Sequence, residues 1–360
     1  MLRHSGIGTY VRGLLGEYEK HPYFERHAFG VALSPALSSE INGAAQSFSF
    51  RSPIYSVWEQ LEYPFHLGRC RLWHAPHYNA PLLKQKARLV VTVHDLIHWI
   101  FRKEFFSKPQ AFYAQQIFQR VVRLADRIIA VSRQTRDDLI QYFGASPERI
   151  RVIYEGVSPE FSVVPEESER KKVLAKYHLP ERFFLNVGLL KPHKNVKRLL
   201  EVFDGLRSEN RIESALVVVG RKDRKYPEGF ERLAALETGD GIHYIEHVES
   251  KKELASLYAS ARALVHPSLY EGFGLTCLEA MALGTPVIVS QTASLPEVVG
   301  EAGYYIDPYS DDSLREALVK IEEDASLRGE LSEQGKRRAR EFSWSKAAEE
   351  TIKVYEEVLE

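Results

Sequence analysis

The sequence has few cysteines, no long apolar run and almost no net charge. Only two of its 360 residues are cysteine, Cys70 and Cys277, and they lie far apart. This gives neither a disulfide framework nor a zinc pattern, so we expect a reducing, cytoplasmic environment. No stretch of about 18 apolar residues is present, which argues against a membrane-spanning helix. The net charge of −1 gives no general attraction to nucleic acid or to an anionic membrane.

The composition is that of an ordinary globular protein, with 44% hydrophobic and 27% charged residues. A chain of 360 residues suits two domains of about 150–200 residues each. Both halves alternate apolar runs with amphipathic stretches, which predicts parallel sheets covered by helices. We expect an N-terminal domain over residues 1–170, a second domain over 171–342 and a final amphipathic helix over 343–360.

The second half shows the alternation most clearly and predicts a doubly wound, Rossmann-like domain. Helices are expected near Asn195–Leu206 and Lys251–Ala261. The strands expected in this half are Phe183–Val187, Ala215–Val219, Ile242–Ile245, Ala263–His266, Pro286–Val289 and Tyr304–Ile306. Those expected in the first half are Ala28–Leu33, Arg71–His74, Leu89–His94, Ile128–Ser132 and Arg151–Tyr154.

The start of the chain departs from this pattern. A Rossmann-like domain should open with a buried strand, but Met1-Leu2-Arg3-His4 leads directly into Gly6-Ile7-Gly8. We therefore expect the first strand of the N-terminal domain to be missing, because the true start lies upstream of Met1 or because the chain is a natural truncation. Without that strand, the first sheet would have an unpaired central edge.

Two glutamates mark the segment between the predicted strands that end at His266 and begin at Pro286. Glu271 and Glu279 are separated by seven residues, with Gly272 and Gly274 in the loop between them. The glycines allow a ligand to approach the backbone closely, and the helix expected to follow presents unpaired amides. Amides for phosphate and carboxylates for hydroxyls suit a sugar nucleotide.

Glu271-Gly272-Phe273-Gly274-Leu275 with Glu279 resembles the E-x7-E signature of the retaining glycosyltransferases of family 4, also called group 1. The resemblance covers essentially the whole chain and implies a GT-B fold, in which two Rossmann-like domains face a cleft and the last helix crosses back to the first domain. The further motifs that carry it are Ser5-Gly6-Ile7-Gly8-Thr9-Tyr10, Thr92-Val93-His94-Asp95-Leu96, Ile129-Ala130-Val131-Ser132 and Val187-Gly188…Pro192-His193-Lys194-Asn195.

The resemblance assigns the donor diphosphate to the loops after the first two strands of the second domain. Lys194 would be the cation beside it, in the loop that Gly188 opens. The family often has an arginine directly after this glycine, where this chain has Leu189, and Arg221 at the next strand end could compensate. The alternative reading of Lys194 is a solvated basic turn.

The two glutamates would hold the sugar and the ribose. Glu271 would contact hydroxyls of the donor sugar and stabilise positive charge near its ring, while Glu279 would accept hydrogen bonds from the ribose hydroxyls. The amides of Phe273, Gly274 and Leu275 would bind sugar or phosphate oxygens. The alternative is that both acids only cap and solvate the helix.

In the first domain, His94 stands at the carboxyl end of a buried predicted strand, where ligands of open α/β sheets gather. The resemblance places it at the donor sugar; the alternative is a structural histidine with internal partners. Gly6 and Gly8 would form a loop at the acceptor or diphosphate. Ser132 would contact the acceptor or, equally well, cap a loop.

No metal or cofactor is expected. Many glycosyltransferases of the other major fold bind Mn²⁺ or Mg²⁺ through Asp-x-Asp, and this chain contains no such pair. Lys194 and the helix terminus would replace the cation. His74 and His77 form an H-x-x-H pair without a third ligand, which does not support a metal site.

We therefore expect metal-independent, retaining transfer of a hexosyl unit, more narrowly mannosyl, from GDP-mannose or a UDP-sugar to a glycan or lipid-linked acceptor. The alternatives are a nucleotide-sugar 2-epimerase and a non-catalytic nucleotide-sugar-binding subunit. The segment Phe101–Phe106 mixes aromatic and basic residues, as a weak peripheral contact with the inner membrane face would, although an ordinary packed loop has the same composition.

Overall fold

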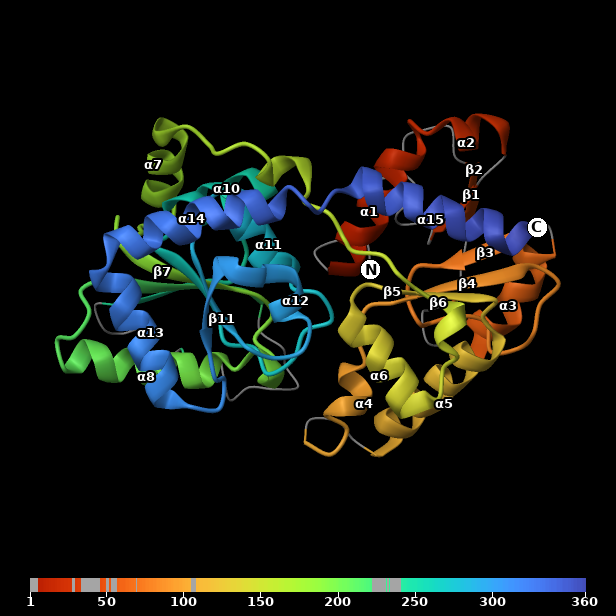
Figure 1. Ribbon diagram of the computed structural model, residues 1–360, viewed down its shortest axis with the longest axis horizontal. Coiled ribbons are helices and arrows are strands. Elements are labelled where there is room, and N and C mark those ends of the chain that lie inside the picture. Colours follow the sequence, from red (N-terminus) through yellow and green to blue (C-terminus); the bar gives the residue numbers. More distant parts are fainter. Residues whose placement is uncertain are drawn as a thin grey trace. The chain divides into compact units, whose positions relative to one another are not determined.

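The computed structural model describes residues 6–27, 30–33, 46–49, 52, 57–68, 70–104, 108–221, 231, 233 and 241–360. The chain forms two compact units (Figure 1). Unit 1 comprises Met1–Gly156 together with Ser343–Glu360, and unit 2 comprises Val157–Phe342. The boundary expected at residue 170 falls inside helix α7 (Glu167–Lys176), which packs on α10 (Lys251–Ser260) of unit 2.

Unit 2 contains a parallel six-stranded sheet in the order β12-β11-β10-β7-β8-β9. The order changes direction between β7 and β10, which is the switch point of a doubly wound sheet. The strands are β7 (Phe183–Val187), β8 (Ala215–Val219), β9 (Ile242–Ile245), β10 (Ala263–His266), β11 (Val287–Ser290) and β12 (Gly303–Ile306).

Helices cover both faces of this sheet (Figure 1), so its central strands are mainly apolar, with Asn186 of β7 and His266 of β10 as buried polar exceptions. All five residues of β8 are buried, and α8 packs Leu199, Leu200 and Phe203 into the same core. Within the described residues, the other elements of unit 2 are η3 (Pro159–Phe161), η4 (Pro192–Lys194), α8 (Val196–Ser208), α11 (Leu275–Ala282), α12 (Leu295–Val299), η5 (Gly300–Ala302), α13 (Asp311–Glu323) and α14 (Ala325–Ala339).

The described residues of unit 1 form two parallel sheets. One has the order β3-β4-β5-β6, with β3 (Leu72–Ala75), β4 (Arg88–Val93), β5 (Arg127–Ala130) and β6 (Ile150–Val152). The other pairs β1 (Gly30–Leu33) with β2 (Gln46–Ser49). Within the described residues, β4 is the only strand that pairs with β3. The segment before Gly6, where we expect a strand to be missing, lies outside those residues.

The helices of unit 1 come from both ends of the chain. They are α1 (Gly6–Tyr18), α2 (Pro22–Arg26), α3 (Val57–Leu67), α4 (Ile97–Ile100), α5 (Lys108–Leu124), α6 (Arg133–Phe143) and α15 (Trp344–Leu359), with a 3-10 turn η2 (Pro147–Arg149). In the described part of the chain, no helix is both long enough and apolar enough to cross a membrane.

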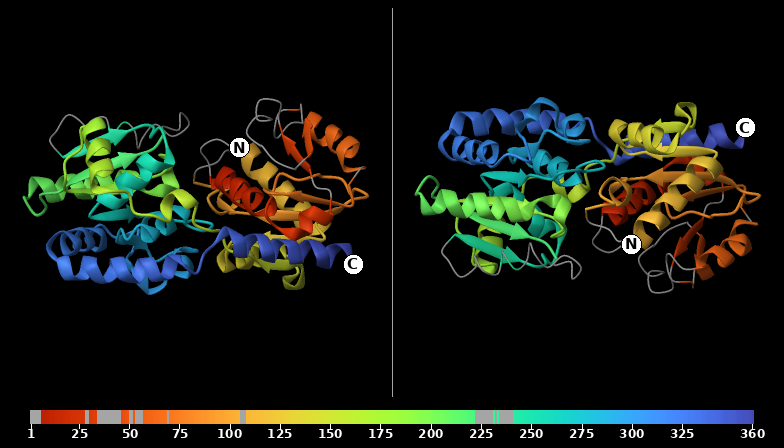
Figure 2. Two further views of the ribbon diagram at one scale, coloured as in Figure 1. Left: turned by 90° about the horizontal axis from the view of Figure 1, so that it is seen from above. Right: turned by 90° about the horizontal axis from the view of Figure 1, so that it is seen from below.

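The last helix, α15, belongs to the core of unit 1 and contacts α1 and three strands (Figure 2). Its first residue, Trp344, sits directly on α1, where a Cβ at Gly13 would lie 2.2 Å from the indole ring. Glycine at position 13 is therefore what allows the two helices to approach so closely.

A chain of buried and partly buried hydrogen bonds also ties α15 to the sheet. The His74 ring is 2.8 Å from the Thr92 hydroxyl and 2.6 Å from the Tyr355 hydroxyl. The Thr92 hydroxyl also bonds to Tyr10, and the Tyr355 hydroxyl to Tyr18. Burial lowers the pKa of His74 to about 3, so its ring is neutral and can serve as donor at one nitrogen and acceptor at the other.

Candidate functional site

In unit 2, three ionisable side chains meet at the carboxyl ends of β7 and β10, the two strands that flank the switch point. Lys194 lies in η4, just after β7, and its Nζ is 2.6 Å from Oε1 of the buried Glu271. His266 is the last residue of β10, and its Nε2 is 2.8 Å from the same oxygen. The strand order thus places a carboxylate between two bases at the position where such sheets bind ligands.

Glu271 is ionised in this cluster. Burial alone would raise its pKa, but the charges of Lys194 and His266 outweigh burial and hold the pKa well below its usual range. Both contacts fall on Oε1, and Oε2 makes no hydrogen bond to any residue that the structure describes. Since Lys194 has three N–H groups, both side chains retain capacity for a ligand.

The loop that carries Glu271 is held in place by protein contacts. The buried Ser294 hydroxyl lies 2.9 Å from the carbonyl oxygen of Glu271 and 3.0 Å from that of Phe273. Gly274 then caps α11 with φ 106°, in the left-handed region that favours glycine. The amides from Gly272 to Leu275 therefore have a fixed geometry at the start of a helix.

Glu279 lies in α11, partly buried, and accepts a hydrogen bond of 3.2 Å from the Tyr258 hydroxyl. Burial raises the pKa of the Cys277 thiol, and the charges of Glu271 and Glu279 raise it further. Glu279 lies in the helix α11 that the Glu271 loop leads into. The structure thus brings Lys194, Glu271 and Glu279 into one region of unit 2.

The two loop residues predicted at the diphosphate lie at the ends of adjacent strands. The amide of Gly188, directly after β7, donates to the Val219 carbonyl at 2.9 Å. The Arg221 carbonyl accepts from the Leu190 amide at 3.2 Å, and the Arg221 side chain is exposed. Residues 222–230, which follow Arg221, lie outside the described residues.

In unit 1, the predicted His94 follows β4 and is buried. Its Nδ1 is 2.9 Å from Oε1 of the buried Glu155, and its Nε2 is 3.0 Å from the Pro76 carbonyl. Both partners are acceptors, so the ring satisfies both only as an imidazolium. Burial opposes this charge, but the hydrogen bond and charge of Glu155 outweigh burial and raise the pKa of His94.

These contacts are those of a structural histidine with internal partners, which was the alternative for His94. A contact between His94 and a sugar stays a prediction. Ser132 is fully buried and caps α6, with its hydroxyl 3.0 Å from the Thr135 amide; an acceptor contact there is also still a prediction. The expectation that Gly6 and Gly8 form a loop is wrong, because both lie in the first turn of α1.

Contacts within unit 1 account in part for the H-x-x-H pair and for the aromatic and basic segment Phe101–Phe106. His74 is bound to Thr92 and Tyr355, and the described residues hold no group of three metal-ligating side chains. In the segment Phe101–Phe106, Arg102 stacks on Trp99 at 3.9 Å and bonds to its carbonyl. Phe105 and Phe106 lie outside the described residues, so the membrane contact is still a prediction.

Sequence reasoning missed two members of these clusters, His266 and Glu155. His266 ends a strand that the sequence predicts correctly, and Glu155 directly follows the predicted strand Arg151–Tyr154. The same rule that selects His94, a polar residue at the carboxyl end of an apolar strand, could have found both.

Two α/β units built on parallel sheets are the architecture of the GT-B glycosyltransferase fold. Residues 5–161 match the family model of Glycosyltransferase Family 4, and residues 167–338 match that of Glycosyl transferases group 1. The chain belongs to this family of group 1, family 4 glycosyltransferases, and it is a hexosyltransferase.

Individual proteins agree with this assignment. The chain is 31% identical to O-antigen chain mannosyltransferase B of Escherichia coli, over 86% of this chain and 79% of that protein. It is 33% identical to the MMP alpha-(1->4)-mannosyltransferase of Mycolicibacterium hassiacum, over 75% of this chain and 66% of that protein. Among solved structures, HepE of Anabaena in complex with UDP-glucose shares the fold, with a TM-score of 0.76 and 17% identity over 99% of this chain and 97% of that one.

Proposed function

We propose that the protein transfers a mannosyl unit, with retention and without a metal ion, from GDP-mannose to a glycan or lipid-linked acceptor of cell-surface polysaccharide. We place this reaction in the cytoplasm, at the inner face of the membrane. The observation that carries the proposal is the Lys194–Glu271–His266 cluster at the switch point of unit 2. Two relatives named as mannosyltransferases support the choice of sugar, and the UDP-glucose complex of HepE supports a nucleotide-sugar donor.

In this proposal, unit 2 binds the donor through groups that the protein already holds in place. An N–H of Lys194 and the amides at the start of α11 bind the diphosphate, with Arg221 beside them. A cation about 4 Å from an anion contributes on the order of 4 kcal/mol at an effective dielectric constant near 20. Oε2 of Glu271 accepts from a sugar hydroxyl, and Glu279 accepts from the ribose.

The role proposed for unit 1 follows from the charge of His94. Both N–H groups of this imidazolium already donate, one to Glu155 and one to the Pro76 carbonyl, so in this proposal Nε2–H binds the sugar by exchanging its bond to Pro76; the cation cannot take up the acceptor's proton. We therefore assign the proton to an oxygen of the leaving diphosphate. The bond from the anomeric carbon to that diphosphate breaks as the acceptor oxygen bonds on the same face, which retains the configuration. Gly6, Gly8 and Ser132 are proposed on the acceptor side.

A donor screen tests the proposal. Purified protein is incubated with GDP-mannose, UDP-glucose and their relatives, with and without acceptor extract, and with EDTA. We expect nucleotide release from GDP-mannose only with acceptor, unchanged by EDTA. Isomerisation without acceptor would indicate a 2-epimerase instead, and a strict loss of activity in EDTA that Mn²⁺ restores would contradict metal independence.

Two variants test the assignment of residues. Glu279→Ala should raise KM for the donor about tenfold, because a charged hydrogen bond is lost. His94→Ala should mainly lower kcat. Glu330→Ala, an exposed change on α14, should leave both constants unchanged. Wild-type turnover of His94→Ala would remove that residue from the site.

A further inference from the structure

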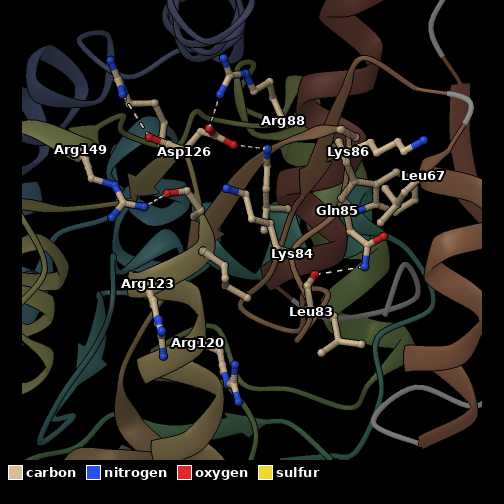
Figure 3. A pocket seen from close by; sticks show the side chains of 16 residues that line it. Leu67, Leu83, Lys84, Gln85, Lys86, Arg88, Arg120, Arg123, Asp126 and Arg149 are labelled. Carbon is tan, nitrogen blue, oxygen red and sulfur yellow. Dashed lines mark hydrogen bonds and ion pairs between the residues drawn. The ribbon is translucent and has the colours of Figure 1, made fainter.

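Unit 1 contains a basic pocket at the edge of its sheet opposite to His94. The pocket has a volume of about 710 Å³ and lies among the loop before β4, the end of α5, and the starts of β5 and β6 (Figure 3). Arg88 begins β4 and Arg127 begins β5, whereas His94 follows the other end of β4. Because six residues of strand span about 20 Å, this pocket is separate from the candidate catalytic edge.

The pocket concentrates positive charge. Of the 16 residues that line it, seven are cationic and one is acidic. In the whole chain, by contrast, 48 Lys and Arg residues are balanced by 49 Asp and Glu residues. The charged lining residues are Lys84, Lys86, Arg88, Arg120, Arg123, Arg127, Arg149 and the single acid Asp126.

The protein neutralises only part of this charge. Asp126 accepts from Arg88 at 3.1 Å and from the Leu89 amide at 2.7 Å. Arg127 pairs with Glu357 of α15 at 3.3 Å. Arg149 donates to the carbonyl of Ala125, which holds the guanidinium in place but leaves its charge uncompensated.

Four further cations have no such partners. Lys84, Lys86, Arg120 and Arg123 are exposed and make no ion pair or hydrogen bond with any residue that the structure describes. In Figure 3, Arg120 and Arg123 extend from successive turns of α5 on the same side of the pocket as Arg149. Like charges gathered in a concave site repel one another, and a bound anion would relieve that repulsion.

We propose that this pocket binds a phosphate-bearing organic anion. Arginine guanidinium groups match phosphate oxygens in charge and geometry. The apolar lining residues Trp73, Leu83 and Leu124, which are exposed or half-buried, add hydrophobic surface for an organic group. The phosphate could belong to a free metabolite or to a lipid headgroup; the volume is that of a small-molecule site. The proposal is independent of the donor site in unit 2.

Calorimetric titration with inorganic pyrophosphate tests it. The variants are Arg120→Gln/Arg123→Gln and a matched control, Lys346→Gln/Lys353→Gln, which removes two exposed cations of α15 that do not line the pocket. All three proteins are also prepared with Lys194→Ala, so that pyrophosphate at the proposed donor site is not counted. The pocket variant should bind at least about tenfold more weakly than the wild type and the control. Equal affinities, or no binding to any protein, would overturn the proposal.

Two further measurements identify the source of the phosphate and verify folding. Sedimentation with phosphatidylglycerol vesicles that depends on Arg120 and Arg123, and that pyrophosphate displaces, supports a lipid headgroup; pyrophosphate binding without vesicle binding supports a free anion. If both double variants bind vesicles equally and neither binds pyrophosphate, the proposal that this pocket binds phosphate is wrong. The pocket variant should melt no lower than the control, and only its stabilisation by pyrophosphate should be lost.

Discussion

At the scale of single residues, Glu155 determines the charge of His94. The carboxylate is buried against Nδ1 of the ring, and a carbonyl occupies the other nitrogen. Removing the charge of Glu155 while keeping its shape should therefore change the protonation of His94 more than the packing around it. This gives a prediction that separates an electrostatic role from a merely structural one.

Glu155→Gln should lower the pKa of His94. In the wild type, the pKa of His94 is higher in the folded than in the unfolded protein, so protonation of His94 stabilises the fold. This stabilisation is complete below about pH 6.5 and is lost as the pH rises through the folded pKa of His94. The variant should lose this extra stability below about pH 6.5, and the alkaline limb of its kcat/KM profile should move to lower pH. NMR titration of the His94 ring measures the shift directly. Glu104→Gln, an exposed change, is the control, and an unaltered titration of His94 would contradict the assignment.

At the scale of secondary-structure elements, α15 is fixed by Trp344 at one end and by the Tyr355 hydroxyl near the other. That hydroxyl bonds to both His74 and Tyr18, so it joins β3, α1 and α15. Its loss would leave the partly buried His74 ring and the buried Tyr18 hydroxyl with one fewer partner each.

Tyr355→Phe should lower the free energy of unfolding of unit 1 by about 1–3 kcal/mol, the usual cost of a buried polar group left without its partner. Tyr142→Phe is the matched control, because that tyrosine is 41% exposed on α6. Chemical unfolding of both variants measures the difference. Equal stability of the two would show that water replaces the lost hydroxyl.

The strands of unit 2 could be predicted because each is a short, mainly apolar run in a parallel sheet, with single polar residues such as Asn186 in β7 and His243 in β9. β11 begins at Val287 rather than at Pro286; the proline has no N–H to donate to a strand ladder. The Lys194–Glu271 pair could not be predicted as a contact, since its members are 77 positions apart in the sequence and only the strand order brings them together. The Gly6–Gly8 segment was assigned to a loop by analogy, and nothing local in Gly-Ile-Gly marks the start of α1.

At the scale of the whole molecule, unit 1 is built from both ends of the chain. Residues Ser343–Glu360 leave unit 2 and complete the core of unit 1. Deleting these residues would expose the apolar surface that α15 covers on α1 and the strands. The buried residues of α15 include Trp344, Ile352, Val354, Tyr355 and Val358.

Deletion of residues 343–360 should unfold unit 1 and leave unit 2 folded. Five buried large side chains at about 1.5–3 kcal/mol each contribute roughly 10 kcal/mol, which is comparable to the total stability of a domain. Hydrogen exchange distinguishes the units: peptides from β4 and β5 should lose protection, while those from β7, β8 and β10 keep it. Deletion of the exposed Glu360 alone should change neither. Retained protection of β4 in the long deletion would mean that the sheet of unit 1 is stable without α15, and that the helix contributes little to its core.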